Sequence, residues 1–372
     1  MPQRANDRIR IESEDGSFTL FTSLTLTNDL TQPCEMSFEC GNDDTYKSLA
    51  PLIAHGALFK VYLNDRMRLL GRVYANTIPV DANGSTVSVT IKSLMSDAWY
   101  ASADPRVGVQ NTNVKDFLLK LYKPLGFGED AFVFKGNVFQ DLMTGKIAKG
   151  GKNPRFIEGI TLDQAKVQIP ETIRDAAARH LKRHGLMHCD TPDGRIYVGP
   201  YDDQQLPIYK FICRRDGRSQ NNILSARKIA DWSDVPSVVN VFGFGTKINE
   251  GIANIGSSAV WQDVLDAGIY HPIYLQNTNL KVQELADRQA LQERASRSKQ
   301  KDAFEITVDG WSYWNGSEAI PYAPNTTADV DIANYGGGVG KYYIYKTSHT
   351  LDANGAATTS LSLVAPGIMD LG

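Results

Sequence analysis

The sequence contains no long apolar run. None of its 372 residues fall in a stretch approaching the roughly 20 apolar residues that a transmembrane helix requires. The N-terminal residues MPQRANDRIRIESEDGSF are polar and charged, which argues against a signal peptide and favours synthesis in a cytoplasm.

Cysteine is also scarce, and positive charge is not in excess. Four cysteines, Cys34, Cys40, Cys189 and Cys213, are too few to form the disulfide framework of a chain this long, so we expect reduced thiols. The net charge of -3 lacks the basic excess of nucleic-acid-binding domains, so no specific nucleic-acid partner is expected. A hydrophobic content of 42% and a charged content of 22% are typical of a globular protein of two or three domains.

Sequence motifs of catalysis are missing as well. There is no Gly-x-Ser-x-Gly elbow, no papain-like cysteine context and no His-Glu-x-x-His. The glycine-rich segment Tyr335 to Tyr342 is superficially like a phosphate loop. It has Tyr335 where that loop needs glycine and Tyr342 where it needs Ser or Thr, and no helix is predicted after it. We therefore predict a turn that leads into a strand.

A histidine cluster is the best metal candidate. Helical spacing places His180 and His184 on one face, and His188 with Cys189 follows closely. Gly185 should end the helix, which assigns His188 to the next strand, and His184 also falls on an apolar stripe. A zinc site and a set of buried histidines both stay open. We predict no catalytic, cofactor-binding or metal-ligating residue and no cofactor.

The most basic part of the chain is the segment Lys146 to Arg155, with Lys149 and Lys152 between them. It could contact phosphate, a membrane or an acidic partner. An exposed loop that keeps itself solvated is the favoured interpretation.

Alternating apolar and polar residues fill the stretch from Leu58 to Ser93. In its last strand Val87, Val89 and Ile91 alternate with hydroxyl side chains. This period of two, with an Asp-Ala-Asn-Gly turn at Asp81 to Gly84, predicts a half-buried antiparallel meander.

The same four-residue turn recurs at Asp352 to Gly355, between strands predicted for Tyr342 to Leu351 and Thr359 to Leu363. Four residues recur easily by chance, so an internal repeat and a coincidence both stay open. Two β units with a different unit between them are the architecture that these patterns favour.

Helical patterns occupy the middle of the chain. Asn113 is a predicted N-cap, and Pro124 and Gly126 should end that helix. A second helix is expected to start near Pro170 and to end at Gly185. A hairpin across the turn Thr191-Pro192-Asp193-Gly194 should follow it.

The second half is predicted to be mainly strand, with one long helix at about Asn279 to Lys299. Its apolar stripe is narrow, which predicts a helix resting on a sheet on one side. We expect a polar loop from Tyr313 to Thr327. The predicted domains are residues 1–100 (first β domain), 101–200 (α+β insert) and 201–372 (second β domain with the long helix).

Taken in order, these segments resemble the baseplate hub proteins of Mu-like contractile-tailed phages, within a group that includes late-control tail proteins and type VI secretion spike hubs. The resemblance covers nearly the whole chain. It rests on an ordered set of segments: Gly71-Arg72-Val73, Asp81 to Gly84, Ser93 to Ala98, His184-Gly185-Leu186, Thr191 to Ile196, Asn222 to Ala226, Trp232-Ser233-Asp234, Phe304 to Trp311, and Tyr345 to Leu363.

The resemblance implies an α+β, mainly β fold with two tube-like antiparallel β-barrel domains and an α+β insert. It implies a ring-shaped homotrimer with pseudo-sixfold symmetry, and it favours the internal repeat. The implied function is structural and not enzymatic: the hub joins a six-fold tail tube to a three-fold spike during tail assembly and host-envelope penetration. The implied partners are the central spike, the tail tube or distal tail protein, and baseplate wedge proteins, in a virion assembled in a bacterial cytoplasm.

Two rival functions remain: a tail-tip cell-wall hydrolase, and the hub of a type VI-like contractile injection system. The stretch Tyr313 to Asn334 also departs from the resemblance, because it is longer and more polar than such hubs predict at that point. Its contacts are therefore open.

Overall fold

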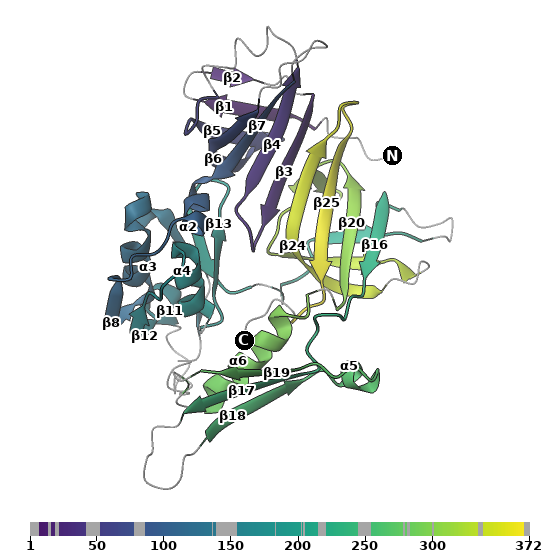
Figure 1. Cartoon of the computed structure of the whole chain (residues 1–372). Helices are drawn as coiled ribbons and strands as arrows, with labels where there is room; N and C mark the ends of the chain where they lie inside the picture. Colours follow the sequence, from purple (N-terminus) through teal and green to yellow (C-terminus); the bar gives the residue numbers. More distant parts are fainter. Residues whose placement is uncertain are drawn as a thin grey trace.

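The structure is a computed structural model. It describes residues 7–13, 16–18, 22–41, 53–77, 86–135, 137–138, 155–182, 184–201, 203, 205–214, 221–244, 254–277, 280, 283–299, 301–333 and 338–367. Most of its regular structure is β-strand in mainly antiparallel sheets, with a smaller helical part (Figure 1). The predicted mainly β, α+β class is confirmed.

The first β unit forms around an apolar core supplied by alternating strand residues. In β5 every second side chain is buried, namely Phe59, Val61 and Leu63, as the period of two predicts. The strands of this unit are β1 (Ile9–Ser13), β2 (Gly16–Phe18), β3 (Ser23–Asp29), β4 (Glu35–Gly41), β5 (Leu58–Leu63), β6 (Arg66–Thr77) and β7 (Thr86–Ser93).

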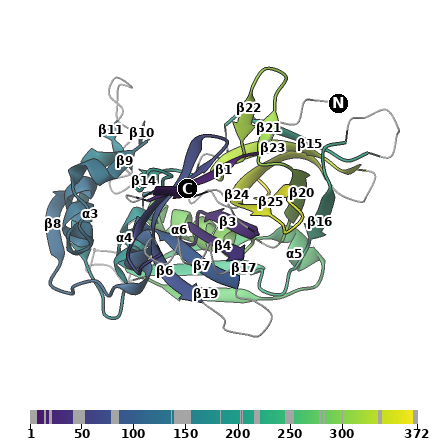
Figure 2. The ribbon, with the colours of Figure 1, turned by 90° about the horizontal axis from the view of Figure 1, so that it is seen from above.

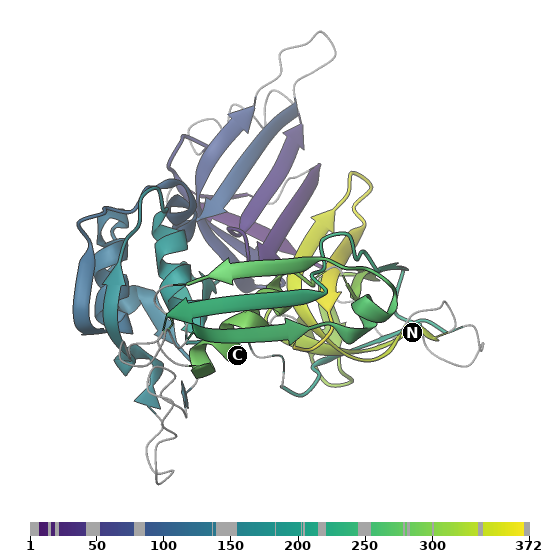
Figure 3. The same ribbon diagram turned by 60° about the horizontal axis from the view of Figure 1, so that its bottom comes forward.

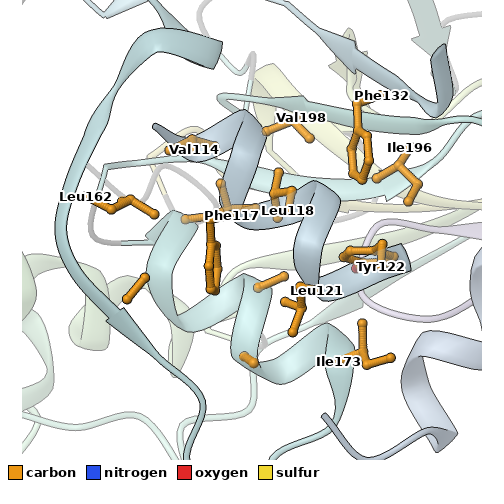
Figure 4. Packing of buried hydrophobic residues seen from close by; sticks show 14 of the residues in the cluster. Val114, Phe117, Leu118, Leu121, Tyr122, Phe132, Leu162, Ile173, Ile196 and Val198 are labelled. Carbon is orange, nitrogen blue, oxygen red and sulfur yellow. The ribbon is translucent and has the colours of Figure 1, made fainter. Parts of the chain in front are cut away.

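The insert unit packs its helices against short strands. Asn113 caps helix α3 as predicted, because its side-chain oxygen accepts the Asp116 N–H at 2.7 Å. Phe117, Leu118 and Leu121 of α3 face the core shown in Figure 4. The elements are η1 (Leu94–Ser96), α2 (Asp97–Tyr100), β8 (Gly108–Asn113), α3 (Val114–Tyr122), η2 (Lys123–Leu125), η3 (Glu129–Ala131), β9 (Phe132–Phe134), β10 (Asn137–Val138), β11 (Arg155–Phe156), η4 (Ile157–Gly159), β12 (Thr161–Lys166), α4 (Ile173–Lys182), β13 (Met187–Asp190) and β14 (Ile196–Gly199).

The second β unit has a core rich in aromatic residues, with Tyr209, Phe211, Phe304 and Tyr322 buried beside branched aliphatic residues. Its longest strand, β24, pairs with three other strands. The strands are β15 (Tyr209–Ile212), β16 (Ser225–Ile229), β20 (Ala303–Asp309), β21 (Ser312–Trp314), β22 (Ala319–Pro321), β23 (Thr326–Asp331), β24 (Val339–Leu351) and β25 (Ala357–Val364).

A separate helix–sheet unit is inserted in the chain between β16 and β20. It contains β17 (Val238–Phe244), β18 (Asn254–Val260), α5 (Gln262–Asp266), β19 (Pro272–Gln276) and α6 (Gln283–Ser296). Ala286 and Ala290 of α6 pack on Val239 and Val241 of β17. The predicted long helix lying on a sheet is thus confirmed. Figure 3 brings the three-stranded sheet to the front, with α6 behind it.

One sheet runs through both β units, in the order β16-β20-β25-β24-β3-β4-β7-β6-β5-β1-β2, with β23 and β15 branching from β24. Seen from above in Figure 2, the insert unit lies beyond the first β unit, on the side away from the second β unit. In Figure 1 the β24–β25 hairpin points up, the helix–sheet unit with α6 lies at the bottom, and the insert unit lies at the left.

Two predictions about local structure are wrong. The expected loop from Tyr313 to Thr327 instead contains β21, β22 and the start of β23. The polar residues of this stretch do not predict a strand, but β23 is stabilised by pairing with β15 and β24, of which β15 is distant in sequence. The second helix begins at Ile173 instead of Pro170, because the Thr172 hydroxyl caps it by accepting the Asp175 N–H at 3.1 Å.

The boundaries proposed at residues 100 and 200 stay predictions. Among the described residues, no helix is both long and apolar enough to cross a membrane. The four cysteines are unpaired, with Cys34, Cys40 and Cys189 buried and Cys213 half-buried.

Candidate assembly surface

The two β units share one strand order. In the first unit it is β3-β4-β7-β6-β5, and in the second it is β16-β20-β25-β24-β23. Every neighbouring pair in both series is antiparallel. This correspondence supports the internal repeat. The turn Asp81 to Gly84 lies outside the described residues, whereas in its counterpart the Asp352 carboxylate accepts the N–H groups of Asn354 and Ala356.

The correspondence extends to irregular features of the backbone. Tyr74 is the extra residue where β6 shifts register against β7, and Tyr345 is the extra residue where β24 shifts register against β25. The carbonyl just before each bulge accepts an N–H at 2.9 Å, from Gly56 in the first unit and from Asn325 in the second. Both donors have left-handed backbone, with φ of 83° and 58°. Matching bulges and matching left-handed residues indicate a duplicated unit.

A turn is repeated at the ends of β3 and β16. The Asp29 carboxylate accepts the backbone N–H and the hydroxyl of Thr31, both at 2.7 Å. The Asp231 carboxylate accepts the same two groups from Ser233, at 2.9 and 2.6 Å. These residues therefore occupy equivalent positions in the two units.

A seam of six residue pairs joins the two units within one chain. Lys346 to Leu351 of β24 run antiparallel to Leu24 to Asp29 of β3. The Thr27 and Ser348 hydroxyls lie 3.2 Å apart across this seam, and the Leu30 N–H donates to Tyr345 O at 3.1 Å. Backbone hydrogen bonds thus make the two units one continuous sheet.

A buried polar chain lies beside the seam. The Thr359 hydroxyl donates to Gly310 O at 2.7 Å, so its oxygen accepts from Nδ1–H of His349 at 3.0 Å. Nε2 of His349 then faces the Arg68 guanidinium at 3.4 Å, and this guanidinium donates to Tyr322 O at 2.5 Å. Burial, reinforced by the Arg68 charge, holds the pKa of His349 well below its usual range. A neutral imidazole can therefore accept from the Arg68 cation.

Asp190 attaches the insert unit to the first β unit. Its Oδ2 accepts the Cys34 N–H and the Ser93 hydroxyl, both at 2.8 Å. Burial raises the pKa of Asp190 to about 6, although both hydrogen bonds act to lower it. Leu30, Met187 and Tyr343 pack together around the same junction. The insert is thereby fixed beside the seam.

Among the strand edges that lack a partner strand in the described part of the chain, one on β16 and one at the end of β6 belong to the two β units. On β16, four of five residues are exposed, from Ser225 to Lys228, although β20 pairs with its other side. On β6, pairing with β5 stops at Arg72, and the following residues Ala75 and Thr77 are exposed. Figure 1 places these two edges on opposite sides of the molecule. Unpaired edges are sites where another strand can add.

The three candidate histidines are all buried but have different neighbours. His180 lies edge-on to Phe117, with ring centroids 5.0 Å apart, and its Nε2 is 3.4 Å from Lys166 O. His188 belongs to β13, as predicted, and contacts Tyr122. Burial lowers the pKa of His188 to about 3. Within the described residues, no three His, Cys, Asp or Glu side chains form a metal-binding group.

Other sequence candidates fall largely outside the described residues. Lys146, Lys149 and Lys152 of the basic segment lie there, and only Arg155 is described, at the start of β11. Tyr335 of the glycine-rich segment also lies there. The segment leads into β24 and not into a helix, which agrees with the predicted turn before a strand.

Comparison with known proteins finds matches in the fold but none in the sequence. No family model matches the sequence, and no curated protein matches it. Among solved structures, a tail protein from Neisseria meningitidis MC58 matches with a TM-score of 0.78 at 16% identity, covering 99% of both chains. The prophage MuSo2 tail protein from Shewanella oneidensis matches with a TM-score of 0.75 at 18% identity, covering 98% of this chain and 100% of that one. The chain has the fold of these phage tail proteins.

An Escherichia coli type VI secretion component, described as structurally similar to T4 tail proteins gp27 and gp5, matches more distantly. Its TM-score is 0.50 at 9% identity, covering 97% of this chain and 75% of that one. The resemblance stated from the sequence is confirmed at the level of the tail fold.

Sequence reasoning missed the residues that hold the tail fold together. The seam, the Arg68–His349 contact and the Asp190 contact each join residues far apart in the chain, so no local spacing marks them. The bulge at Tyr74 and Tyr345 did leave a signal, because each tyrosine precedes an Asp-Ala-Asn-Gly turn by seven residues.

Proposed function

We propose that this protein is the structural hub of a contractile phage tail baseplate. The observation that carries the proposal is the duplication: one chain contains two β units of matching strand order joined in one sheet. The tail fold supports the same assignment. Each β unit is then one tube-like barrel, and three chains form a ring of six near-equivalent units.

The two ends of the molecule suit different partners. At one end β24 returns as β25 after a short turn, and β6 ends and β7 begins at the same end (Figure 1). At the other end, β4 follows β3 after five residues, whereas the helix–sheet unit separates β16 from β20. In a ring of three chains, the first end would present six similar hairpins, which suits a six-fold tail tube. The second end would alternate between a short connection and a helix–sheet unit, which suits a three-fold spike.

Further partners follow from this assignment. The hub contacts the central spike, the tail tube or a distal tail protein, and baseplate wedge proteins, and it is located in the virion after assembly in the host cytoplasm. The protein acts by symmetry matching and not by catalysis.

Light scattering of the purified protein over a hundredfold concentration range tests the ring. We expect a mass three times that of the 41.1 kDa chain at the upper concentrations. A strict monomer, both alone and when co-expressed with the spike protein of the same tail, would contradict the proposed homotrimer.

A type VI-like injection-system hub is the second candidate, because the tail fold also matches a type VI secretion component. Neighbouring capsid and terminase genes would favour the phage tail. The tail-tip hydrolase alternative requires activity on peptidoglycan. A zymogram with clearing by the purified protein would overturn the structural assignment.

A further inference from the structure

We propose that β16 of one copy pairs antiparallel with the end of β6 in the next copy, with Thr77 opposite Ile229. This inference rests on the proposed homotrimer and specifies the residues through which its subunits join. The argument uses the seam between β3 and β24 as a template for a second seam between copies.

The first step matches β3 with β16. Both strands lie beside equivalent neighbours, β4 and β20, and both end in the repeated aspartate turn. That turn places Asp231 at the position of Asp29. Counting two residues back from each aspartate places Ile229 at the position of Thr27. The strand pairing agrees, because Thr27 lies opposite the first residue of β4 and Ile229 lies opposite the first residue of β20.

The second step matches the end of β6 with the end of β24. The bulged residues Tyr74 and Tyr345 are equivalent, and each is followed by a segment that pairs with β7 or β25. Counting three residues on from each bulge places Thr77 at the position of Ser348.

The third step compares the strands with which β24 and β6 pair after their bulges. After its bulge β24 leaves β23 and pairs with β3, where Ser348 lies opposite Thr27. After its own bulge β6 has left β5, and no described strand takes the place of β3. The strand that corresponds to β3 is β16, and its free edge lies on the far side of the same molecule (Figure 1). Only a second copy can bring the two edges together.

The chemistry of the two edges fits such a joint. On β16, Arg227 pairs with Glu305 of β20 at 2.7 Å, and Lys228 pairs with Asp302, the residue just before β20, at 3.5 Å. These charges keep the exposed edge soluble and discourage unspecific pairing, while its backbone groups stay available. Because different surfaces of the two copies meet, the contact is head-to-tail and can close into a ring.

By the template, the Trp232 N–H donates to the Tyr74 carbonyl of the next copy, as Leu30 does to Tyr345 within the chain. Asp231 then lies opposite Ala75. The within-chain equivalent is an ion pair between Asp29 and Lys346 at 3.9 Å, and alanine removes that lysine. The joint between copies therefore lacks one ion pair that the internal seam has.

Cysteine cross-linking tests the register in the full-length protein with Cys213→Ser as background. The Thr77→Cys/Ile229→Cys double variant should give disulfide-linked dimers and trimers on a non-reducing gel after mild oxidation, because the template side chains touch at 3.2 Å. Mixing the Thr77→Cys and Ile229→Cys single variants should give a covalent dimer only, since each mixed pair has one productive joint.

Two control variants test whether the cross-link forms between chains and whether it depends on the register. Thr27→Cys/Ser348→Cys should cross-link within one chain and leave the gel mass unchanged. Thr77→Cys/Lys228→Cys places one thiol on the other face of the sheet and should cross-link at least tenfold less. A protein that is trimeric by light scattering but gives no Thr77–Ile229 cross-link overturns the register alone. A protein that is monomeric under all conditions overturns the homotrimer, and this inference with it.

Discussion

At the scale of single residues, the core of the molecule and the junctions between its units contain buried ionisable groups whose pKa values are shifted. His349 stays neutral beside the Arg68 cation, and His188 is neutral in the insert core. Asp190 accepts two hydrogen bonds between the insert and the first β unit while its pKa is raised to about 6. Stability should therefore depend on pH through these buried groups.

The sign of each contribution follows from its pKa. For Asp190 the folded-state pKa of about 6 exceeds the ordinary 3.8, so its stabilising contribution is complete at low pH and is lost as pH rises through 6. For His188 the folded-state pKa of about 3 lies below the ordinary 6.5, so its contribution is present at neutral pH and is lost on acidification. The two effects oppose each other between pH 4 and 6.

Asp190→Asn should remove the first of these effects. The amide oxygen can still accept from Cys34 and Ser93. We expect the free energy of unfolding of the variant, relative to the native chain, to rise by about 3 kcal/mol between pH 4 and pH 7, since two pKa units correspond to about that energy. Urea unfolding at a series of pH values measures it. Asp130→Asn, at an exposed site, is the control, and parallel curves for the native and Asp190→Asn chains would contradict the role of Asp190.

At the scale of elements, β6 and β7 approach each other so closely at one position that only glycine fits there. Gly71 on β6 lies opposite Ser93 of β7, and a Cβ there would lie 2.3 Å from Lys92 O. A backbone oxygen cannot move aside as a flexible side chain can. The glycine therefore sets the distance between β6 and β7, next to the bulge that the proposed joint uses.

Gly71→Ala should lower the free energy of unfolding by about 3 kcal/mol, at the upper end of the usual overpacking cost, because the added methyl meets backbone. Thermal and urea unfolding measure the loss. Gly128→Ala is the matched control, since Gly128 has a negative φ and its Cβ would meet nothing within 4 Å. Equal stability of the two variants would mean that β6 and β7 can separate freely.

At the scale of the whole molecule, one continuous sheet links two copies of a unit, and the proposed joint extends this sheet from chain to chain. Folding and association are then coupled, because the exposed edges of β6 and β16 become paired only in the ring. Trp311 shows how closely the units already depend on each other: it follows β20 of the second unit but packs in the core of the first.

Such coupling predicts a concentration-dependent melting temperature. A complex of several chains is stabilised by mass action, so the melting temperature should rise by several degrees over a hundredfold increase in protein concentration. Differential scanning calorimetry measures this. A melting temperature constant over that range would show that unfolding does not involve dissociation.

The sequence by itself determined the elements whose stability is local. Alternation gave β5 and β7, and the Asn113 cap with the stops at Pro124 and Gly126 gave α3, since neighbours along the chain decide strand faces and helix ends. It also gave the order of segments that resembles tail hubs. Of the candidate surface, only the repeated turn was identified from the sequence, and the tyrosine seven residues before each copy was recognised only from the structure.

The tertiary structure alone decided how these elements join. Short polar β23 is a strand because β15 and β24 flank it, and β15 is distant from it in sequence. The seam pairs residues near position 25 with residues near position 350, and the Arg68–His349 contact joins β6 to β24. Such contacts depend on burial and on the pairing of distant backbones. Local patterns do not encode either, so the free edges they leave became visible only in the folded chain.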